Sequence, residues 1–117
     1  MGKRILIVDD SSIMRKMIRK TLEPHGHDIV GEAKNGEEAV ALYQRLRPDL
    51  VTMDITMRGM DGFTAAKEIL KFDDSAQIVF LSHLHDEKYS EDALRLGAIG
   101  YINKHKSQEL LNIIDND

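Results

Sequence analysis

Short apolar runs alternate along this chain with longer segments in which apolar residues recur at helical spacing. Runs of about four apolar residues are typical of buried strands, and recurrence every three or four residues is typical of amphipathic helices. The runs predict five strands, at residues 5–8, 29–31, 50–53, 78–81 and 98–102. The segments between and after these strands predict five helices.

The first predicted helix has the clearest boundaries. It begins behind a serine cap, at Ser11 or Ser12, and it ends before Pro24 and Gly26. We expect it to bury one apolar face, made of Ile13, Met14, Met17, Ile18 and Leu22. The four later helices have apolar faces that begin near Ala39, Phe63, Tyr89 and Leu110.

Strict alternation of strands and helices predicts a doubly wound α/β fold. Its five strands would form a parallel sheet joined by right-handed crossovers, with helices on both faces. The nearly continuous apolar character of residues 5–8, 50–53 and 78–81 indicates strands that are covered on both sides. Two strand orders compete, because dinucleotide-binding folds and flavodoxin-like folds share this pattern.

The turn after the first strand distinguishes these two orders. A dinucleotide-binding fold requires a glycine-rich turn there, where the helix approaches pyrophosphate. This chain has the sequence DDSS at residues 9–12 instead. Acidic side chains would repel a phosphate unless a cation lay between them. The pattern therefore disfavours the nucleotide-binding order.

Length, charge and composition narrow the class of protein. The 117 residues fit one domain, which we expect to span residues 1–117. The chain has no cysteine, so disulfides and thiolate chemistry are excluded. Its net charge of −4, without a long basic run, predicts no direct nucleic-acid binding by this segment. No apolar run is long enough for a membrane span, so we expect a cytoplasmic protein without a membrane partner.

Three carboxylates follow two of the predicted strands. Asp9 and Asp10 come directly after the first strand, and Asp54 comes directly after the third. Ligands of open α/β sheets bind at the carboxyl ends of the strands, where these acids would meet. Like charges held together repel one another unless a cation screens them. Oxygen ligands of this kind suit Mg²⁺.

Two further polar residues would join the acids at the same edge. Ser82 follows the fourth strand and Lys104 follows the fifth. A carboxylate can attack phosphorus to form an acyl phosphate. A metal ion, a hydroxyl and an ammonium could then each bind one of the phosphoryl oxygens. The constellation therefore predicts a phosphoryl-transfer site.

The motifs together resemble the response-regulator receiver domain of two-component signalling. The matching segments are ILIVDD at 5–10, DITM at 54–57, GMDG at 59–62, LS at 81–82, GA at 97–98 and GYINK at 100–104. The resemblance covers roughly residues 3–114 and implies the flavodoxin-like strand order 2-1-3-4-5. The first half is similar to chemotaxis-type receivers. The second half, including residues 85–87, is similar to receivers fused to helix-turn-helix transcription regulators.

The resemblance implies a role for each residue of the constellation. Asp54 would be the phosphoacceptor, and Asp9, Asp10 and Asp54 would bind Mg²⁺ together with the backbone carbonyl of Thr56. Ser82 and Lys104 would contact the phosphoryl oxygens. Ser82 and Tyr101 would form the switch that follows phosphorylation.

The resemblance also implies partners. The phosphoryl donor would be a sensor histidine kinase or a phosphotransfer protein. The changed surface, formed by the fourth helix, the fifth strand and the fifth helix, would bind an output protein or a fused output domain. A phosphorylation-dependent dimer is a further expectation. The domain would be regulatory rather than an enzyme, beyond catalysing its own phosphotransfer and dephosphorylation.

The chain departs from the usual receiver pattern at three positions. Arg58 stands where many receivers have proline, and His105 replaces the proline that often follows the lysine. We therefore predict a trans peptide bond between Lys104 and His105, since a cis bond before a non-proline residue costs about 2.5–4 kcal/mol. His83 replaces a residue that is often small, and its bulk could alter the lifetime of the acyl phosphate.

The sequence leaves two other functional classes possible, a hydrolase and a constitutive binding module. It also leaves zinc possible as a second metal. A hydrolase of the aspartyl-phosphate type would use similar groups, but it generally needs an Asp-x-Asp pair, and here the acids are adjacent. A receiver that acts only as a constitutive binding module would not need all the key residues, which are intact here. His83, His85 and His105 could form one rim and bind zinc, although their spacing is not diagnostic.

Overall fold

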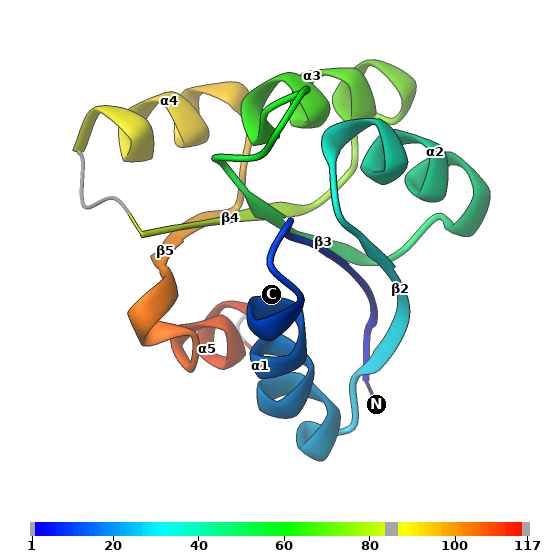
Figure 1. The fold of residues 1–117 in the computed structure, drawn as a ribbon, viewed down its shortest axis with the longest axis vertical. Helices are drawn as coiled ribbons and strands as arrows, with labels where there is room; N and C mark the ends of the chain where they lie inside the picture. The colour runs from blue at the N-terminus through cyan, green and yellow to red at the C-terminus, as the bar shows by residue number, and fades with distance from the viewer. Residues whose placement is uncertain (1, 84–86, 116–117) are drawn as a thin grey trace.

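The computed structural model describes residues 2–83 and 87–115 and contains one five-stranded parallel sheet. Its strand order is β2-β1-β3-β4-β5, which confirms the flavodoxin-like prediction (Figure 1). The strands are β1 (Arg4–Val8), β2 (Asp28–Ala33), β3 (Leu50–Asp54), β4 (Ile78–Ser82) and β5 (Gly100–Asn103). The helices are α1 (Ser12–Leu22), α2 (Gly36–Leu46), α3 (Gly62–Phe72), α4 (Glu87–Leu96) and α5 (Glu109–Asp115).

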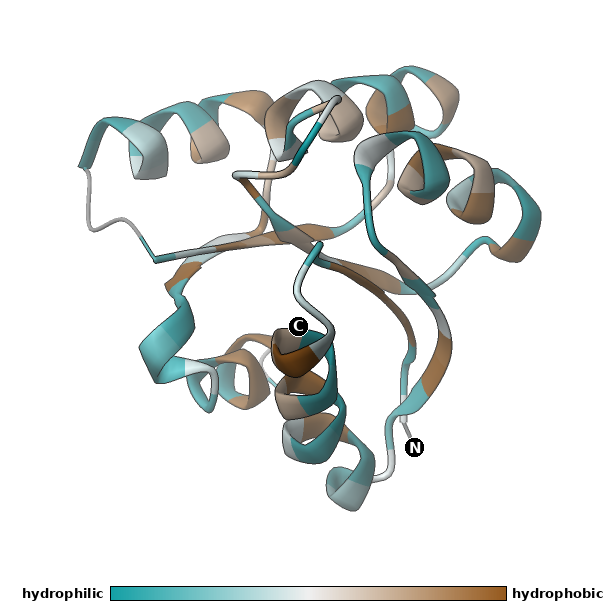
Figure 2. Cartoon of the chain, in the orientation of Figure 1, coloured by the Kyte–Doolittle hydropathy of each residue, from teal (hydrophilic) through white to brown (hydrophobic). Residues whose placement is uncertain are grey.

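The helices cover both faces of the sheet. In Figure 1, α1 and α5 lie on one side, and α2, α3 and α4 lie on the other. Alternate residues of each strand point to opposite faces, so Leu6 and Val8 pack in one core while Ile5 and Ile7 pack in the other. The central strands are accordingly hydrophobic along most of their length (Figure 2). The two cores hold the carboxyl ends of the strands in fixed positions.

The exposed side of α1 differs from the sequence prediction. Met14, Ile18 and Leu22 are buried as expected, but Ile13 is 72% exposed and Met17 is 46% exposed. Residues four apart lie in one row along a helix, and neighbouring rows point in different directions. The sheet covers only the row of Met14, Ile18 and Leu22. The prediction that Ile13 and Met17 belong to the buried face was therefore wrong.

The ends of α1 agree with the prediction. Ser11, rather than Ser12, is the N-cap, because its side-chain oxygen accepts a hydrogen bond from the Met14 N–H at 3.2 Å. The helix ends at Leu22 and is followed by one 3₁₀ turn, Glu23–His25. Gly26 then adopts the left-handed conformation, with φ of 87°, which glycine accommodates without steric cost.

The fifth strand begins later than residue 98, where the sequence pattern placed it. The Ala98 N–H donates to the Ala93 carbonyl at 3.0 Å and so completes the end of α4. Gly97 permits this turn with φ of 112°. Pairing with β4 starts at Ile99, whose N–H donates to the Ile78 carbonyl at 2.9 Å. Ala98 therefore belongs to the end of α4, although its hydrophobicity alone placed it in the fifth strand.

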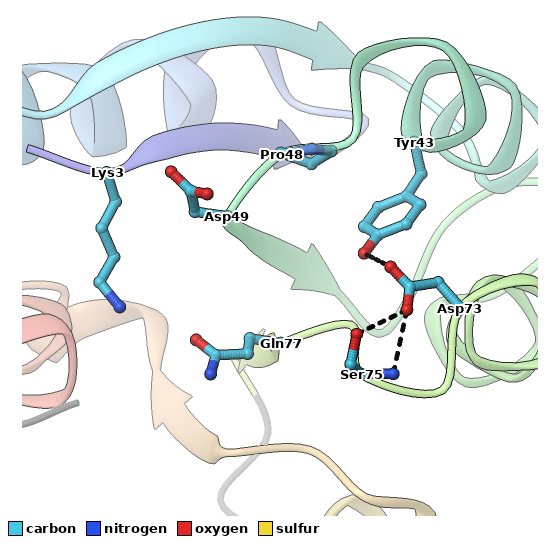
Figure 3. A pocket seen from close by; sticks show the side chains of 7 residues that line it. All are labelled: Lys3, Tyr43, Pro48, Asp49, Asp73, Ser75 and Gln77. Atoms are coloured by element: carbon cyan, nitrogen blue, oxygen red, sulfur yellow. Dashed lines mark hydrogen bonds between the residues drawn. The ribbon is translucent and has the colours of Figure 1, made fainter.

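A polar pocket lies at the opposite edge of the sheet from the three carboxylates (Figure 3). The Tyr43 hydroxyl donates a hydrogen bond of 2.8 Å to Asp73, which also accepts bonds from the N–H and hydroxyl of Ser75. Burial, together with the bond to Asp73, raises the pKa of Tyr43 to about 12. These bonds connect α2 to the turn after α3 and stabilise the scaffold. The remaining lining residues are Lys3, Pro48, Asp49 and Gln77.

Candidate functional site at the carboxyl edge of the sheet

Three charged side chains lie buried where three strands of the sheet end. Asp9 follows β1, Asp54 is the last residue of β3, and Lys104 follows β5. Their exposed fractions are only 1%, 3% and 5%. Charged residues are rarely buried to this extent unless they are paired. The parallel register brings them together from distant parts of the chain.

Lys104 bridges the two buried carboxylates. Its Nζ lies 2.8 Å from Asp9 Oδ2 and 3.0 Å from Asp54 Oδ1. The other oxygen of Asp9 accepts a hydrogen bond of 2.8 Å from the Ser11 N–H. One oxygen of Asp9 is therefore hydrogen-bonded and the other is held by the ion pair with Lys104, which gives the carboxylate a fixed orientation.

Asp10 completes an acidic cluster beside this pair. One carboxylate oxygen from each of Asp9, Asp10 and Asp54 lies within 4.8 Å of the others, and Asp10 is exposed. Three ionised carboxylates and one ammonium leave a formal charge of −2, which one divalent cation would balance. The donors are all oxygens, as Mg²⁺ prefers. The residues thus fit a magnesium ion that would retain part of its water shell.

The buried charges shift each other's protonation. Burial raises the pKa of Asp54 to about 6; the hydrogen bond from Lys104 opposes this rise, and the negative charges of Asp9 and Asp10 add to it. Burial alone would lower the pKa of Lys104, but its hydrogen bonds to Asp9 and Asp54 outweigh that effect and raise it. At neutral pH the site therefore contains a charged Lys104 and a mostly ionised Asp54. The ionised form of Asp54 is less favourable here than it would be in water.

The loop after Asp54 depends on a close approach of α3. Gly62, the first residue of α3, donates its N–H to the Ile55 carbonyl at 2.8 Å. A Cβ at this position would lie 2.2 Å from the Asp54 carbonyl oxygen and 2.9 Å from the Ile55 Cα. Both contacts are with backbone atoms, which cannot rotate away. Gly62 therefore allows α3 to pack directly behind Asp54.

We predict that Gly62→Ala destabilises the protein by about 1–3 kcal/mol, the usual range for overpacking. The added methyl group would push the end of β3 away from α3 and displace Asp54 from Lys104. Urea unfolding would measure the loss of stability. Gly59→Ala is not a suitable control, because Gly59 has φ of 76°. Ala65→Gly is a better comparison, since it loosens α3 without introducing a clash. If Gly62→Ala and Ala65→Gly disturb the surroundings of Asp54 equally, the steric explanation is contradicted.

Ser82, Tyr101 and Thr56 occupy the regions that the sequence predicted. Ser82 is the last residue of β4, is 2% exposed and pairs in register with Asn103 of β5. Tyr101 is half-buried and packs against the core on the side of α2, α3 and α4. Thr56 is exposed in the loop between β3 and α3. Their roles in phosphoryl binding and switching remain predictions.

Sequence reasoning missed the arginine that supports Asp9. Arg15 Nη1 donates to the Asp9 carbonyl at 2.7 Å, and Arg15 Nε pairs with Glu32 of β2 at 3.0 Å. Arg19 also pairs with Glu32, at 2.7 Å. The two arginines stand four residues apart in the sequence, which places them on the same side of α1. Their shared partner, Glu32, lies on β2, and the sequence pattern gave no indication of that contact.

The segment after Lys104 confirms the predicted trans peptide bond, since the described residues contain no cis peptide. Lys104–Lys106 forms a 3₁₀ turn, and the Asn103 side-chain oxygen accepts a 2.8 Å hydrogen bond from the His105 N–H. Proline has no N–H and could not make this bond. The rings of His83 and His105 lie in contact, whereas His85 and Asp86 are outside the described residues.

Comparison with known protein families shows to which family the chain belongs. Residues 5–115 match the family described as the response regulator receiver domain. The chain belongs to this family. The predicted family is thereby confirmed, and the chain is a receiver domain of the regulatory class.

Two of the curated relatives are chemotaxis proteins. The receiver domain is 46% identical over 104 residues to the chemotaxis protein CheY of Thermotoga maritima, covering 89% of this chain and 87% of that protein. It is 48% identical over 104 residues to the chemotaxis protein CheY of Bacillus subtilis, with the same coverage of both chains.

Solved structures show the same fold. A LuxR-family two-component response regulator from Aurantimonas sp. superposes with a TM-score of 0.94 at 33% identity, covering 99% of this chain and 84% of that one. The CheX-CheY-BeF₃-Mg²⁺ complex from Borrelia burgdorferi gives a TM-score of 0.92 at 35% identity, covering 97% and 87%. The receiver domain therefore resembles both chemotaxis proteins and a LuxR-family two-component response regulator. In its described part, it contains no helix with the length and apolar character needed to cross a membrane.

Proposed function

We propose that this receiver domain is a phosphorylation switch that accepts a phosphoryl group on Asp54 in a Mg²⁺-dependent reaction. The donor would be the phosphohistidine of a sensor histidine kinase or of a phosphotransfer protein. The observation that carries the proposal is the buried contact between Asp54 and Lys104, beside the carboxylates of Asp9 and Asp10. Membership of the receiver family supports it.

The geometry favours Asp54 over its neighbours as the acceptor. Asp9 accepts a hydrogen bond from the Ser11 N–H with one oxygen and forms an ion pair with Lys104 through the other, which fixes its orientation beside the acidic cluster. Asp10 is exposed, where water stabilises its charge and lowers its reactivity. Asp54 is partly desolvated, and its pKa of about 6 leaves it mostly ionised at neutral pH.

The proposed reaction exchanges one bond for another. A carboxylate oxygen of Asp54 attacks phosphorus, and the phosphorus–nitrogen bond of the phosphohistidine breaks with its electron pair returning to the imidazole. Lys104 lies 3.0 Å from Asp54 Oδ1 and is placed to pair with a phosphoryl oxygen. Ser82, buried at the adjacent strand end, would donate its hydroxyl to another.

Asp9, Asp10, Asp54 and the Thr56 carbonyl would hold the magnesium ion. When bound, Mg²⁺ supplies positive charge that balances the carboxylates and the incoming phosphoryl group. The presence of Mg²⁺ in the Borrelia burgdorferi CheY complex supports this choice of metal. Asp9 would keep its orientation through Ser11 and Arg15.

Phosphorylation would change the surface formed by α4, β5 and α5. The phosphoryl group adds charge and hydrogen-bond acceptors at Asp54. Ser82 would move toward it, and the half-buried ring of Tyr101 would fill the space left behind. Such coupling is typically about 1–3 kcal/mol, so the result would be a shift between existing conformations.

The partner of this surface would be an output protein or a fused output domain. The CheX–CheY complex and the LuxR-family regulator support both forms. The protein would act in the cytoplasm, without binding nucleic acid through this segment, and phosphorylation could promote a dimer. Beyond its own phosphotransfer and dephosphorylation, we propose no enzymatic turnover.

A small phosphodonor tests the proposal without knowledge of the kinase. Incubation with acetyl phosphate and Mg²⁺ should add one phosphoryl group to the wild-type protein, as measured by intact mass, and chelation of Mg²⁺ should prevent the addition. Asp54→Asn should remain unmodified, whereas Asp74→Asn, at an exposed position, should react like the wild type. Equal modification of Asp54→Asn would refute the assignment. Absence of any modification would favour a constitutive binding module, and catalytic release of phosphate from a phosphate ester would favour a hydrolase.

A further inference from the structure

Two histidines beside the phosphorylation site have no part in the proposed phosphotransfer. The ring centroids of His83 and His105 lie 5.5 Å apart, with an angle of 49° between the ring planes. Both residues are exposed, so the rings meet at the surface rather than in the core. The contact joins two segments that are distant in the sequence.

The backbone holds both histidines in place. His83 directly follows Ser82, which pairs in register with Asn103. His105 lies in the 3₁₀ turn Lys104–Lys106, and its N–H is bonded to the Asn103 side chain at 2.8 Å. Both imidazoles therefore extend from the ends of neighbouring strands, and little ordering would be needed to bring them together.

The separation of the rings suits a shared metal ion. A zinc–nitrogen bond of about 2.0–2.1 Å places the metal about 3.2 Å from the centroid of each imidazole, and a tetrahedral angle then puts the two centroids about 5.2 Å apart. The observed distance of 5.5 Å is close to this value, and rotation of the two exposed side chains would turn one nitrogen of each ring toward the shared ion. Because both side chains are exposed, water can supply the remaining ligands.

We propose that His83 and His105 form a binding site for a divalent transition metal of the Zn²⁺, Ni²⁺ or Cu²⁺ class. Imidazole nitrogen suits these ions, whereas carboxylate and carbonyl oxygens suit Mg²⁺. The site is thus distinct in chemistry from the cluster of Asp9, Asp10 and Asp54. The receiver domain would carry two neighbouring metal sites with different preferences.

Occupation of the histidine site would restrain the switch. A metal bound by both imidazoles would connect the segment after β4 to the segment after β5. Ser82 and Lys104, which precede the two histidines, would then lose freedom to rearrange around a phosphoryl group. This consequence rests on the proposed function, whereas metal binding by the two histidines does not.

Zinc titration followed by NMR of the imidazole side chains tests the binding. With Mg²⁺ in large excess, Zn²⁺ should shift the His83 and His105 resonances together and saturate at one equivalent. The double variant His83→Ala/His105→Ala should bind this equivalent at least tenfold more weakly by calorimetry. His25→Ala removes an exposed histidine elsewhere and should bind as the wild type does. Unchanged affinity in the double variant, or shifts confined to the surroundings of Asp9, Asp10 and Asp54, would overturn the site.

Phosphorylation kinetics test the consequence separately. At a Zn²⁺ concentration that fills the histidine site, the rate with acetyl phosphate should fall several-fold in the wild type and clearly less in the double variant. Equal slowing of both proteins would mean that zinc acts at the carboxylates and would refute the coupling. Failure of the zinc-free wild type to accept phosphoryl would refute the proposed function instead, and the NMR result would be unaffected.

Discussion

Replacing Asp54 with asparagine should raise the free energy of unfolding of the metal-free protein at pH 7 by about 1–3 kcal/mol. Asp54 is 3% exposed, and burial raises its pKa to about 6 from an ordinary value of 3.8. Ionising this side chain therefore costs more in the folded protein than in the unfolded chain. Asparagine keeps a similar shape but carries no charge, so it removes this cost.

The pH dependence follows from the direction of this shift. Between about pH 4 and pH 6 the folded protein binds more protons at Asp54 than the unfolded chain does, so stability from this group falls as pH rises. The advantage of Asp54→Asn should consequently be full above about pH 6 and should disappear near pH 4. Urea unfolding in a chelator, repeated across this range, would measure it.

Two controls separate the buried charge from other effects of the substitution. Asp74→Asn changes an exposed carboxylate and should leave stability almost unchanged. Saturating Mg²⁺ should stabilise the wild type and so reduce the advantage of Asp54→Asn. If the variant is less stable than the wild type in chelator at pH 7, the buried charge of Asp54 is not destabilising and the prediction is wrong.

Replacing Lys104 with methionine should have the opposite effect and lower the free energy of unfolding by about 3–5 kcal/mol without metal at pH 7. The ammonium lies 2.8 Å from Asp9 Oδ2 and 3.0 Å from Asp54 Oδ1. Methionine preserves most of the side-chain volume but leaves two buried carboxylates without their counter-charge. Lowering the pH should restore part of the loss, because protonation removes the repulsion.

Mg²⁺ offers a second way to test this explanation. A divalent cation at the acidic cluster would replace the missing positive charge, so Mg²⁺ should stabilise Lys104→Met more than it stabilises the wild type. Lys106→Met is the matched control, since Lys106 is exposed in the same 3₁₀ turn, and should have little effect. Equal losses at positions 104 and 106 would show that the turn, rather than the buried ion pair, is responsible.

If both substitutions give these results, the site lowers the stability of the fold in favour of the proposed reactivity of Asp54. Asp54 is held in a partly desolvated place, where its charge is disfavoured, and Lys104 compensates only in part. In the proposed function, a bound metal ion would neutralise part of this charge, and the negative charge of Asp54 would pass to the phosphoryl group when the carboxylate reacts. Functional sites commonly carry such a cost in stability.

The sequence by itself determined the fold and the position of the site. Apolar runs of the right length specify buried strands, and their alternation with helices specifies a parallel sheet. The polar residues of the site lie within two positions of the ends of such runs, so their meeting at one end of the sheet was predictable; they are Asp9, Asp10, Asp54 and Lys104. This part succeeds because strand direction follows from the alternation of strands and helices, while the strand order came from the resemblance to receiver domains and is confirmed by the structure.

Tertiary structure decided the contacts that tune the site. Sequence could not show that Lys104 bridges Asp9 and Asp54, that Ile13 and Met17 remain exposed, or that His83 touches His105. It also could not show that Gly62 is needed because a backbone carbonyl approaches it. Each of these depends on distances between elements that are remote in the chain, and those distances result from how two cores pack around one twisted sheet.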